Sequence, residues 1–279
     1  MTAPQARPVN LGGPPWTGGA GSPSAFCVLA PNPGPMTLDG TNTWILHATG
    51  AGQALLVDPG PDDEGHLAAV RAACQERGAS VTGILLTHGH PDHSAGARLF
   101  AEAFGVGVRA LDPQHRLGGE GLAEGDRVGA GDLVVEVVAT PGHTHDSLCF
   151  VLAEEGAVLT GDTVLGRGTT VVAHPDGRLA PYLSSLDRLR RLAEDGAVAT
   201  VLTGHGPVLP DLGGVVATYV AHRKERLEQV REAVVAGRTS AQGVVAHVYA
   251  DVDRGLWPAA ELSVRAQLEY LQEEYRELD

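Results

Sequence analysis

The sequence predicts an α+β protein in which two mixed sheets pack face to face with helices outside them, a four-layer αββα sandwich. Three observations predict this class. Short apolar runs typical of buried strands alternate with segments of helical spacing between residues 25 and 213. Four of these runs end in a Gly or Pro break that is followed by His or Asp. Residues 214–279 shift to dense charge at helical spacing, which predicts a small C-terminal helical domain.

The elements follow in chain order. Residues 1–24 are rich in Pro and Gly, so we expect an irregular N-terminal arm there. Apolar runs predict strands at 26–30, 43–46, 54–57, 81–86, 106–110, 133–139, 148–152, 157–159 and 199–202. The runs 43–46 and 54–57 would form a hairpin across Gly50-Ala51-Gly52. Helical spacing predicts helices at 66–77, 94–104, 183–194, 215–235 and 241–249, and a last helix from residue 257.

Composition and charge exclude several classes. Hydrophobic residues make up 43% of the 279 residues, enough for a sizeable core, and the formal net charge of −14 argues against generic binding to nucleic acid or an anionic membrane. No signal-like start and no apolar stretch of about 20 residues is present, so we expect a cytoplasmic protein without membrane contact. Three scattered cysteines, Cys27, Cys74 and Cys149, do not predict a disulfide framework.

The motif that organises the chain is His88-Gly89-His90-Pro91-Asp92-His93, on the loop after the strand-like run 81–86. It offers four ligands, whereas a catalytic zinc ion needs three and an open position. Other runs are followed by His143, Asp162 and His205 in the same way, so four strands would bring ligands to one sheet edge. These residue types at these positions predict two metal ions in one cleft; the alternative for the first motif is a His-rich polar loop.

With Asp58-Pro59-Gly60 upstream, these motifs resemble those of the metallo-β-lactamase-fold hydrolases over about residues 25 to 210. Four shorter motifs are similar to one branch, the relatives of β-lactamase-like protein 2: Asn32-Pro33-Gly34, Gly40-Thr41-Asn42-Thr43, Tyr182-x-x-Ser185-Leu186 and Tyr219-x-x-His222-Arg223-x-x-Arg226. The resemblance implies a winged-helix-like C-terminal domain. From Val216 to Asp279 we count eight Arg and Lys against eleven Asp and Glu, which is the wrong sign for DNA binding.

The resemblance also assigns the ligands. One metal ion would be held by His88, His90 and His143, the other by Asp92, His93 and His205, with Asp162 bridging them. Two such ions lie about 3.5–4 Å apart and share a hydroxide, a nucleophile available near neutral pH. Asp92 and Asp162 would orient that hydroxide. We expect two zinc ions per chain, although iron or manganese also suit His and Asp ligands.

Several residues have two possible roles. Asp58 would fix a ligand by a hydrogen bond or serve as a turn residue, and His145 would donate a proton to the leaving group or lie on the rim. Substrate contact is possible for Asn42, Thr43, Thr169 and Thr170. Tyr182 would line the pocket or pack against the helical domain. His222 and Arg223 would reach the cleft and meet an anionic substrate, or form a solvated face.

Hydrolysis is favoured over oxygen reduction because Asp92 and His93 keep the hydrolase ligand set and no flavodoxin-like segment follows. The first hypothesis is a thioester or ester hydrolase for a small acyl substrate, as in the glyoxalase-II-like relatives, acting as a monomer or homodimer. The alternative is a single-strand endoribonuclease, which needs a basic groove and stacking aromatics. Aromatic residues are only 4% of the chain, but Arg188, Arg190 and Arg191 could form a local basic patch. A metal-holding binding protein is a third possibility.

Overall fold

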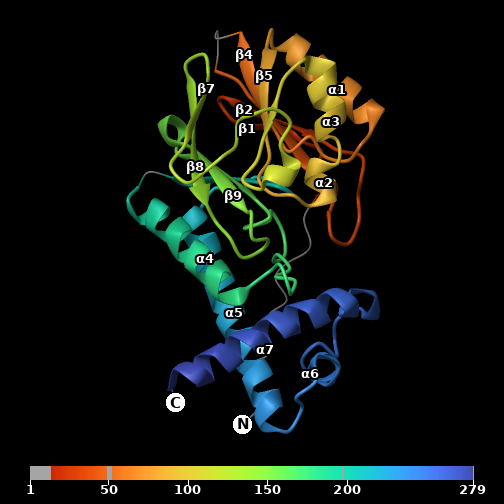
Figure 1. Ribbon diagram of the computed structural model, residues 1–279, viewed down its shortest axis with the longest axis vertical. Coiled ribbons are helices and arrows are strands. Elements are labelled where there is room, and N and C mark those ends of the chain that lie inside the picture. The colour runs from red at the N-terminus through yellow and green to blue at the C-terminus, as the bar shows by residue number, and fades with distance from the viewer. Residues whose placement is uncertain (1–13, 49–51, 197, 279) are drawn as a thin grey trace.

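The computed structural model describes residues 14–48, 52–196 and 198–278, and within them the two predicted sheets are present (Figure 1). The first sheet has the order β1-β2-β3-β4-β5-β6. Its strands are β1 (Gly19–Ser22), β2 (Ala25–Leu29), β3 (Asn42–Leu46), β4 (Gln53–Val57), β5 (Ser80–Leu85) and β6 (Val108–Arg109). The second has the order β11-β10-β9-β8-β7. Its strands are β7 (Arg127–Ala130), β8 (Leu133–Ala139), β9 (Leu148–Leu152), β10 (Ala157–Gly161) and β11 (Thr200–Thr203).

Both sheets are mixed, as predicted. The pairs β4–β5, β5–β6 and β10–β11 are parallel, and the other neighbouring pairs are antiparallel. The β3–β4 hairpin is confirmed, with Trp44 opposite Val57 and Ile45 opposite Leu56. Residues 49–51, which include Gly50 and Ala51 of its predicted turn, lie outside the described residues.

Helices cover the outer face of each sheet, which confirms the four-layer αββα arrangement. The described helices are α1 (Glu64–Glu76), α2 (Pro91–Ser94), α3 (Ala97–Phe104), α4 (Leu179–Glu194), α5 (Leu212–Val235), α6 (Ala241–Val248) and α7 (Trp257–Leu278), with short 3-10 turns η1 (Pro113–His115), η2 (Ala153–Glu155) and η3 (Arg254–Leu256). Helices α1 and α3 pack on the first sheet, and α4 with the first half of α5 packs on the second. Side chains such as Trp44 and Phe150 fill the space between the sheets.

Strand sequences reflect these layers. In β8 the side chains of Leu133 and Val135 are buried while those of Val134 and Glu136 are exposed, the alternation of a strand with one wet face. Strands β9 and β10 are buried throughout, because one face meets the first sheet and the other meets α4 and α5. Full burial of each large apolar side chain contributes roughly 1.5–3 kcal/mol.

The long helix α5 connects the sandwich to the C-terminal helices (Figure 1). Its N-terminal half shares a core with α4 through Val216 and Tyr219. Its C-terminal half forms a separate small core with α6 and α7, built around Val230, Val245 and Val264. The Ser240 side chain accepts a hydrogen bond from the Gly243 backbone N–H, so Ser240 is the N-cap of α6 as predicted.

Three expectations about the elements were wrong. The predicted irregular arm contains β1, which pairs with β2, and the Trp16 indole donates to Asn42 Oδ1 at 2.8 Å. Strand β7 was not predicted. The predicted helix 94–104 is two helices, because Gly96 packs against the Gly60–Pro61 backbone, and α2 includes Asp92 and His93 themselves. Residues 1–13 lie outside the described part of the chain.

Two predictions of absence concern the described residues. The three cysteines are buried and unpaired, in agreement with the expectation of no disulfide framework. Across residues 14–48, 52–196 and 198–278, no helix combines the length and apolar character needed to cross a membrane.

Candidate functional site

The predicted ligands meet at one end of the sandwich. His88, His90, Asp92 and His93 follow β5 of the first sheet, whereas His143, Asp162 and His205 follow β8, β10 and β11 of the second. The sequence predicted one sheet edge, and this was wrong: the ligands come from two sheets that face each other. The ligands can meet because the strands that precede them, β5 in the first sheet and β8, β10 and β11 in the second, all finish at the same end of the sandwich.

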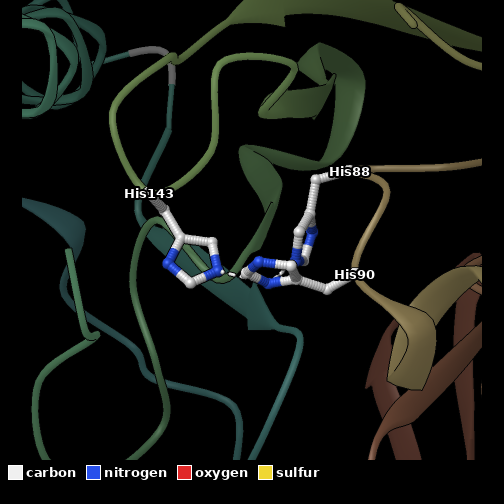
Figure 2. Close-up of side chains that lie close together, drawn as sticks. All are labelled: His88, His90 and His143. Carbon is white, nitrogen blue, oxygen red and sulfur yellow. Dashed lines mark hydrogen bonds between the residues drawn. The ribbon is translucent and has the colours of Figure 1, made fainter. Parts of the chain in front are cut away.

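The first ligand set is His88, His90 and His143. His90 Nδ1 lies 3.1 Å from His88 Nε2 and 3.0 Å from His143 Nε2. Figure 2 shows the three rings converging, two of them from the loop after β5 and the third from the loop after β8. The three nitrogen atoms are close enough to hold one metal ion.

The second set is Asp92, His93 and His205. His205 Nε2 lies 3.2 Å from both His93 Nε2 and Asp92 Oδ2. The Asp162 carboxylate lies between the two sets. Its Oδ2 is 3.6 Å from His143 Nε2 and 3.4 Å from His205 Nε2, and its Oδ1 is 3.4 Å from His93 Nε2. Asp162 therefore contacts a member of each set.

Hydrogen bonds at the far side of the rings fix their tautomers. His143 Nδ1 donates to the Val171 carbonyl at 2.8 Å, and His205 Nδ1 donates to the Gly40 carbonyl at 3.1 Å. His93 Nδ1 donates to Asp58 Oδ2 at 2.8 Å. These oxygens only accept, so each neutral ring carries its proton on Nδ1 and turns the Nε2 lone pair toward the centre.

Asp58 extends this arrangement to His88. Asp58 accepts from the Thr87 backbone N–H at 2.8 Å and from the Thr87 hydroxyl at 2.7 Å. Since the single hydroxyl proton is used there, Thr87 Oγ1 accepts from His88 Nδ1 at 3.0 Å. Asp58 thus orients one ring of each set, and it does so from a strained left-handed conformation with φ +53°. This geometry agrees with the predicted role of Asp58 and also with its position in a turn.

The donor set fits divalent metal ions. Asp162 Oδ1 is buried and has no hydrogen-bond partner within the described residues. The facing ring nitrogens carry lone pairs that repel unless protons or cations lie among them. Burial alone would lower the pKa of His205, yet the Asp162 carboxylate raises it to about 9. Burial would raise the pKa of Asp162, but the His205 and His93 charges hold it well below its usual range. The site favours positive charge at its centre.

Two glycines allow the ligand loops to pack this closely. A Cβ on Gly204 would lie 2.5 Å from Asp162 Oδ1 and 2.9 Å from His93 Cε1. Gly142, at φ +134°, would place a Cβ 2.3 Å from the Tyr182 backbone nitrogen. The Gly before His205 and the Gly before His143 are therefore required by close approach.

A cavity of about 350 Å³ lies beside the ligands. His143 and Asp162 are among the residues that line it. The remaining wall comes from the loop after β2, the segment after β10, and the helices α5 and α7 with the turns between α6 and α7; it includes Met36, Leu38, Leu165, Arg167, Thr169, Thr170, His222, Arg223, Arg226, Tyr249, Val252, Leu256, Ala259, Ala260 and Ser263. Of the predicted contact residues, Thr169, Thr170, His222 and Arg223 line this cavity.

The other predicted contacts lie behind the site. Asn42 is fully buried and donates to the carbonyls of Thr203 and Gly206, both at 2.9 Å, which holds the His205 loop. Thr43 donates to the Asp58 carbonyl at 2.7 Å. Both side chains are used by the protein's own backbone, so the expected substrate contact is wrong for them. Tyr182 donates to the Thr163 carbonyl at 2.8 Å and packs in the core beneath α4.

His145 lies outside the residues that line the cavity. Its Nδ1 is 2.6 Å from Asp176 Oδ1, and its Nε2 is 3.4 Å from Asp112 Oδ2. Partial burial would lower its pKa, but the Asp176 hydrogen bond and the nearby carboxylates raise it. The ring therefore favours the charged form, and proton donation by His145 stays a prediction.

Sequence reasoning missed several residues. Arg226 lines the cavity, and its signal was present: Tyr219, Arg223 and Arg226 recur at helical spacing, which puts them on one face of α5. Tyr249, Val252 and Leu256 also line it, and no local pattern marks them. The His115 ring lies against Gly89, where a Cβ would meet His115 Nε2 at 2.1 Å, so it flanks the first ligand loop.

Comparison with known proteins identifies the family. The model of the metallo-beta-lactamase superfamily matches residues 36–205, and that of the beta-lactamase associated winged helix domain matches residues 240–276. An atrochrysone carboxyl ACP thioesterase of Aspergillus aculeatus is 35% identical over 213 residues, which cover 75% of this chain and 64% of that protein. The chain likewise spans 64% of the length of a lactamase-like protein of Aspergillus niger.

Two further relatives match over most of their length. A beta-lactamase-like protein 2 homolog of Drosophila melanogaster is 30% identical over 275 residues, covering 90% of this chain and 88% of that protein. The crystal structure of a metallo-beta-lactamase family protein from Thermus thermophilus superposes with a TM-score of 0.74 at 25% identity, covering 90% and 94% of the two chains. The chain therefore belongs to the metallo-beta-lactamase superfamily of hydrolases and carries the associated winged-helix domain at its C-terminal side.

Proposed function

We propose that the protein is a dinuclear-metal-dependent hydrolase that cleaves a thioester or ester of a small acyl substrate. One observation carries this proposal: His143 and Asp162, which belong to the ligand cluster, line the cavity, while much of its remaining wall is apolar. A small acyl group in this cavity would place its carbonyl carbon at the ligand end. A thioesterase among the relatives supports the same reaction class.

Each ligand set has a defined task in the proposal. His88, His90 and His143 would hold one metal ion and Asp92, His93 and His205 the other, with Asp162 shared between them. Two divalent ions, zinc by default with iron or manganese as alternatives, would supply an ionised water near neutral pH and polarise the acyl oxygen.

The protein's own groups prepare this centre. Asp58 and Thr87 hold His93 and His88 in place before substrate arrives, so little reorganisation is needed during the reaction. Asp162 stays ionised across the neutral range because its pKa lies well below the usual value. His145, whose pKa is raised, is the candidate for protonating the leaving group.

A single-strand endoribonuclease is the second candidate, since a dinuclear His and Asp site also serves phosphodiesters. The basic patch that would favour it is electrically balanced. Arg188 pairs with Glu124, Arg190 pairs with Asp187 and with Glu194 at 2.5 Å, and Arg191 pairs with Asp187 at 2.7 Å. A patch that pairs its own charges attracts a phosphate backbone weakly, so this candidate ranks below the acyl hydrolase.

A side-by-side rate assay tests the proposal. One metal-loaded preparation is offered a panel of acyl thioesters and a labelled single-stranded RNA, each with and without chelator. The variants are His88→Ala and, as the matched control, His247→Ala, an exposed histidine on α6. We expect thioester cleavage that chelator and His88→Ala abolish and His247→Ala preserves. RNA cleavage that depends on His88, with inert thioesters, would overturn the assignment.

A further inference from the structure

The side of the cavity that α5 contributes is basic, and only some of its hydrogen-bond donors have a partner among the described residues. His222, Arg223 and Arg226 lie on one face of α5 and line the cavity. Arg223 is only 8% exposed; its Nη2 donates to the Thr170 carbonyl, and its guanidinium carbon lies 5.1 Å from the centre of the Tyr182 ring. Its buried Nε has no hydrogen-bond partner among the described residues. A buried cation with this few partners is costly unless an anion joins it.

Arg226 lies beside it with unused donors. Its Nη1 donates to Gln229 Oε1 at 2.9 Å and to the Val248 carbonyl at 3.0 Å, and its guanidinium carbon lies 4.5 Å from the centre of the Tyr249 ring. In the described part of the chain, no carboxylate oxygen lies within 4.0 Å of a side-chain nitrogen of Arg223 or Arg226.

Neighbouring arginines show that such pairing is available. Arg231, further along α5, pairs with Glu274 at 2.7 Å, and Arg167, also at the cavity, pairs with Asp39. We call the part of the cavity wall formed by Arg223 and Arg226 the α5 corner. Among the described residues, these two arginines have no carboxylate partner, whereas an arginine on the same helix and one on the same cavity wall each have one.

His222 responds to the positive potential of the two arginines without adding charge to it. Burial and the charges of Arg223 and Arg226 lower its pKa to about 4, so the ring is neutral at pH 7. Its Nδ1 is buried without a partner in the described residues. Asp162 is the one carboxylate among the described lining residues, and it belongs to the ligand cluster. The α5 corner therefore offers donors and positive charge with no internal acceptor.

The cavity wall is apolar where α7 and the turn before it contribute. Val252, Leu256, Ala259 and Ala260 supply that surface. An occupant that suits this lining has a reactive carbonyl for the ligand residues, an apolar part and an anionic group.

We propose that the substrate carries an anionic group, a carboxylate or a phosphate, which Arg223 and Arg226 bind at the α5 corner of the cavity, while its apolar part packs on Val252, Leu256 and Ala260. This inference rests on the proposed thioester hydrolase. A carboxylate would belong to the acyl chain, and a phosphate would belong to a phosphopantetheine-type thiol. Arg226 is the better test position, because its side chain is only partly buried, whereas Arg223 is buried in the core.

Four thioesters separate these sources: hexanoyl and adipoyl, each on uncharged N-acetylcysteamine and on phosphopantetheine. The enzymes are wild type, Arg226→Gln, the charge-retaining Arg226→Lys, and Arg231→Gln as the same substitution on the same helix outside the cavity. Metal content and thermal unfolding are measured for each. We expect Arg226→Gln to lose about 10- to 100-fold in kcat/KM on the anionic thioesters alone, the loss expected for one charged hydrogen-bonded contact. Arg226→Lys should keep part of the rate, and Arg231→Gln all of it.

The pattern identifies the anion. A loss confined to adipoyl substrates assigns a carboxylate, and a loss confined to phosphopantetheine substrates assigns a phosphate. Equal effects of Arg226→Gln on all four thioesters would overturn the inference and leave the proposed function standing.

If no thioester is cleaved, the proposed function fails, and calorimetric binding of adipate and of phosphopantetheine to wild type and Arg226→Gln decides the anion site separately. Binding that Arg226→Gln weakens at least about tenfold supports the site. Binding that the variant leaves unchanged, or no binding at all, overturns it, as does RNA that is cleaved in an Arg226-dependent way.

Discussion

Two polar regions of the cavity wall are built by different means: the metal end, formed by the ligand cluster, and the α5 corner, formed by Arg223 and Arg226. At the metal end, the rings of His88, His93, His143 and His205 are each fixed by an oxygen of the protein, and their free lone pairs face the centre. At the α5 corner, Arg223 and Arg226 keep hydrogen-bonding capacity that the described residues do not use. The first end is organised before anything binds, whereas the second is completed by its ligand.

This difference separates the residues that carry the reaction from those that determine which substrate is accepted. The sandwich supplies the metal end from the loops of four strands, so substitutions there should affect reaction and metal binding together. The helices α5 and α7 supply much of the remaining cavity wall, so substitutions there should change which substrate is accepted. The predictions that follow test the rigidity of the metal end and the limits of the corner.

The largest effect is expected at Asp162. Asp162→Ala removes the carboxylate that, among the described residues, contacts both ligand sets. We expect metal occupancy to fall and the rate to drop by at least about 10³-fold, because a catalytic metal supplies several kcal/mol of transition-state stabilisation. Metal analysis and kcat/KM are measured on the same sample, with Asp187→Ala as a surface control. A variant that keeps two metals and the full rate would disprove the bridging role.

The second prediction concerns His66, which hydrogen-bonds to Thr43, the residue that donates to the Asp58 carbonyl. His66 Nε2 donates to Thr43 Oγ1 at 2.8 Å, and its Nδ1 is buried without a partner in the described residues. Burial lowers its pKa to about 4, against 6.5 in the unfolded chain. The unfolded state therefore binds the proton first, and the stability from neutral His66 is complete above pH 6.5 and declines as pH falls toward 4, by about 3 kcal/mol.

Urea unfolding of metal-free protein at pH 7 and pH 4.5 measures this effect. His66→Gln should be less stable than wild type at pH 7 but should lose less stability on acidification. The other histidines titrate in both proteins, so the difference between the two pH dependences isolates His66. Identical pH dependences would show that His66 is not held neutral.

The third prediction is a loss of metal affinity in Asp58→Asn. The amide has a single acceptor oxygen. It therefore cannot accept the Thr87 backbone N–H bond made by Oδ1 as well as the Thr87 hydroxyl and His93 bonds made by Oδ2. Ligands held less firmly bind metal less well, and we expect about 10- to 100-fold weaker binding with the fold preserved. Competition with a chelator of known affinity gives the constant. Unchanged affinity would reduce Asp58 to the turn residue that the sequence also allowed.

The smallest effect is expected at Arg190. Its guanidinium already pairs with Asp187 and Glu194 on the surface of α4, so Arg190→Gln should leave thioester turnover and metal content unchanged. The same variant is tested on single-stranded RNA. A fall in RNA cleavage or binding would show that the paired arginines of α4 contact a phosphate backbone. Substrate selection would then not be made by the α5 corner.

Local patterns explain what the sequence could predict. Strand β5 ends in the buried apolar residues Ile84 and Leu85, and the break at Gly89 and Pro91 predicts that the polar residues lie beyond the strand end. For this reason the sequence alone was enough to predict that the seven candidate ligands group together. The helix α2, on which Asp92 and His93 lie, was not predicted. Strand β1 was not predicted either, because Gly19-Ala20-Gly21-Ser22 has no apolar alternation; Gly21 instead fits against the Trp44 ring, a contact made 23 residues away.

The cavity could not be predicted for a related reason. Its wall joins residues near Met36, the segment after Asp162, α5 and α7, which meet only after the helical domain has docked. Asn42 illustrates the same limit: its amide satisfies carbonyls at Thr203 and Gly206, a partnership that no local pattern reveals. Helical spacing on α5 was the one available signal, and it placed Arg226 beside Arg223.

The most direct test of the account is a metal titration of the thioester rate. Protein stripped with a chelator is reloaded with zinc in steps, and bound metal and kcat/KM for a cleaved thioester are measured at each step. The account predicts no activity without metal and a rate that reaches its plateau at two ions per chain, with His88→Ala and Asp162→Ala both failing to reach it. Full turnover by the metal-free protein, or a plateau at one ion, would contradict it.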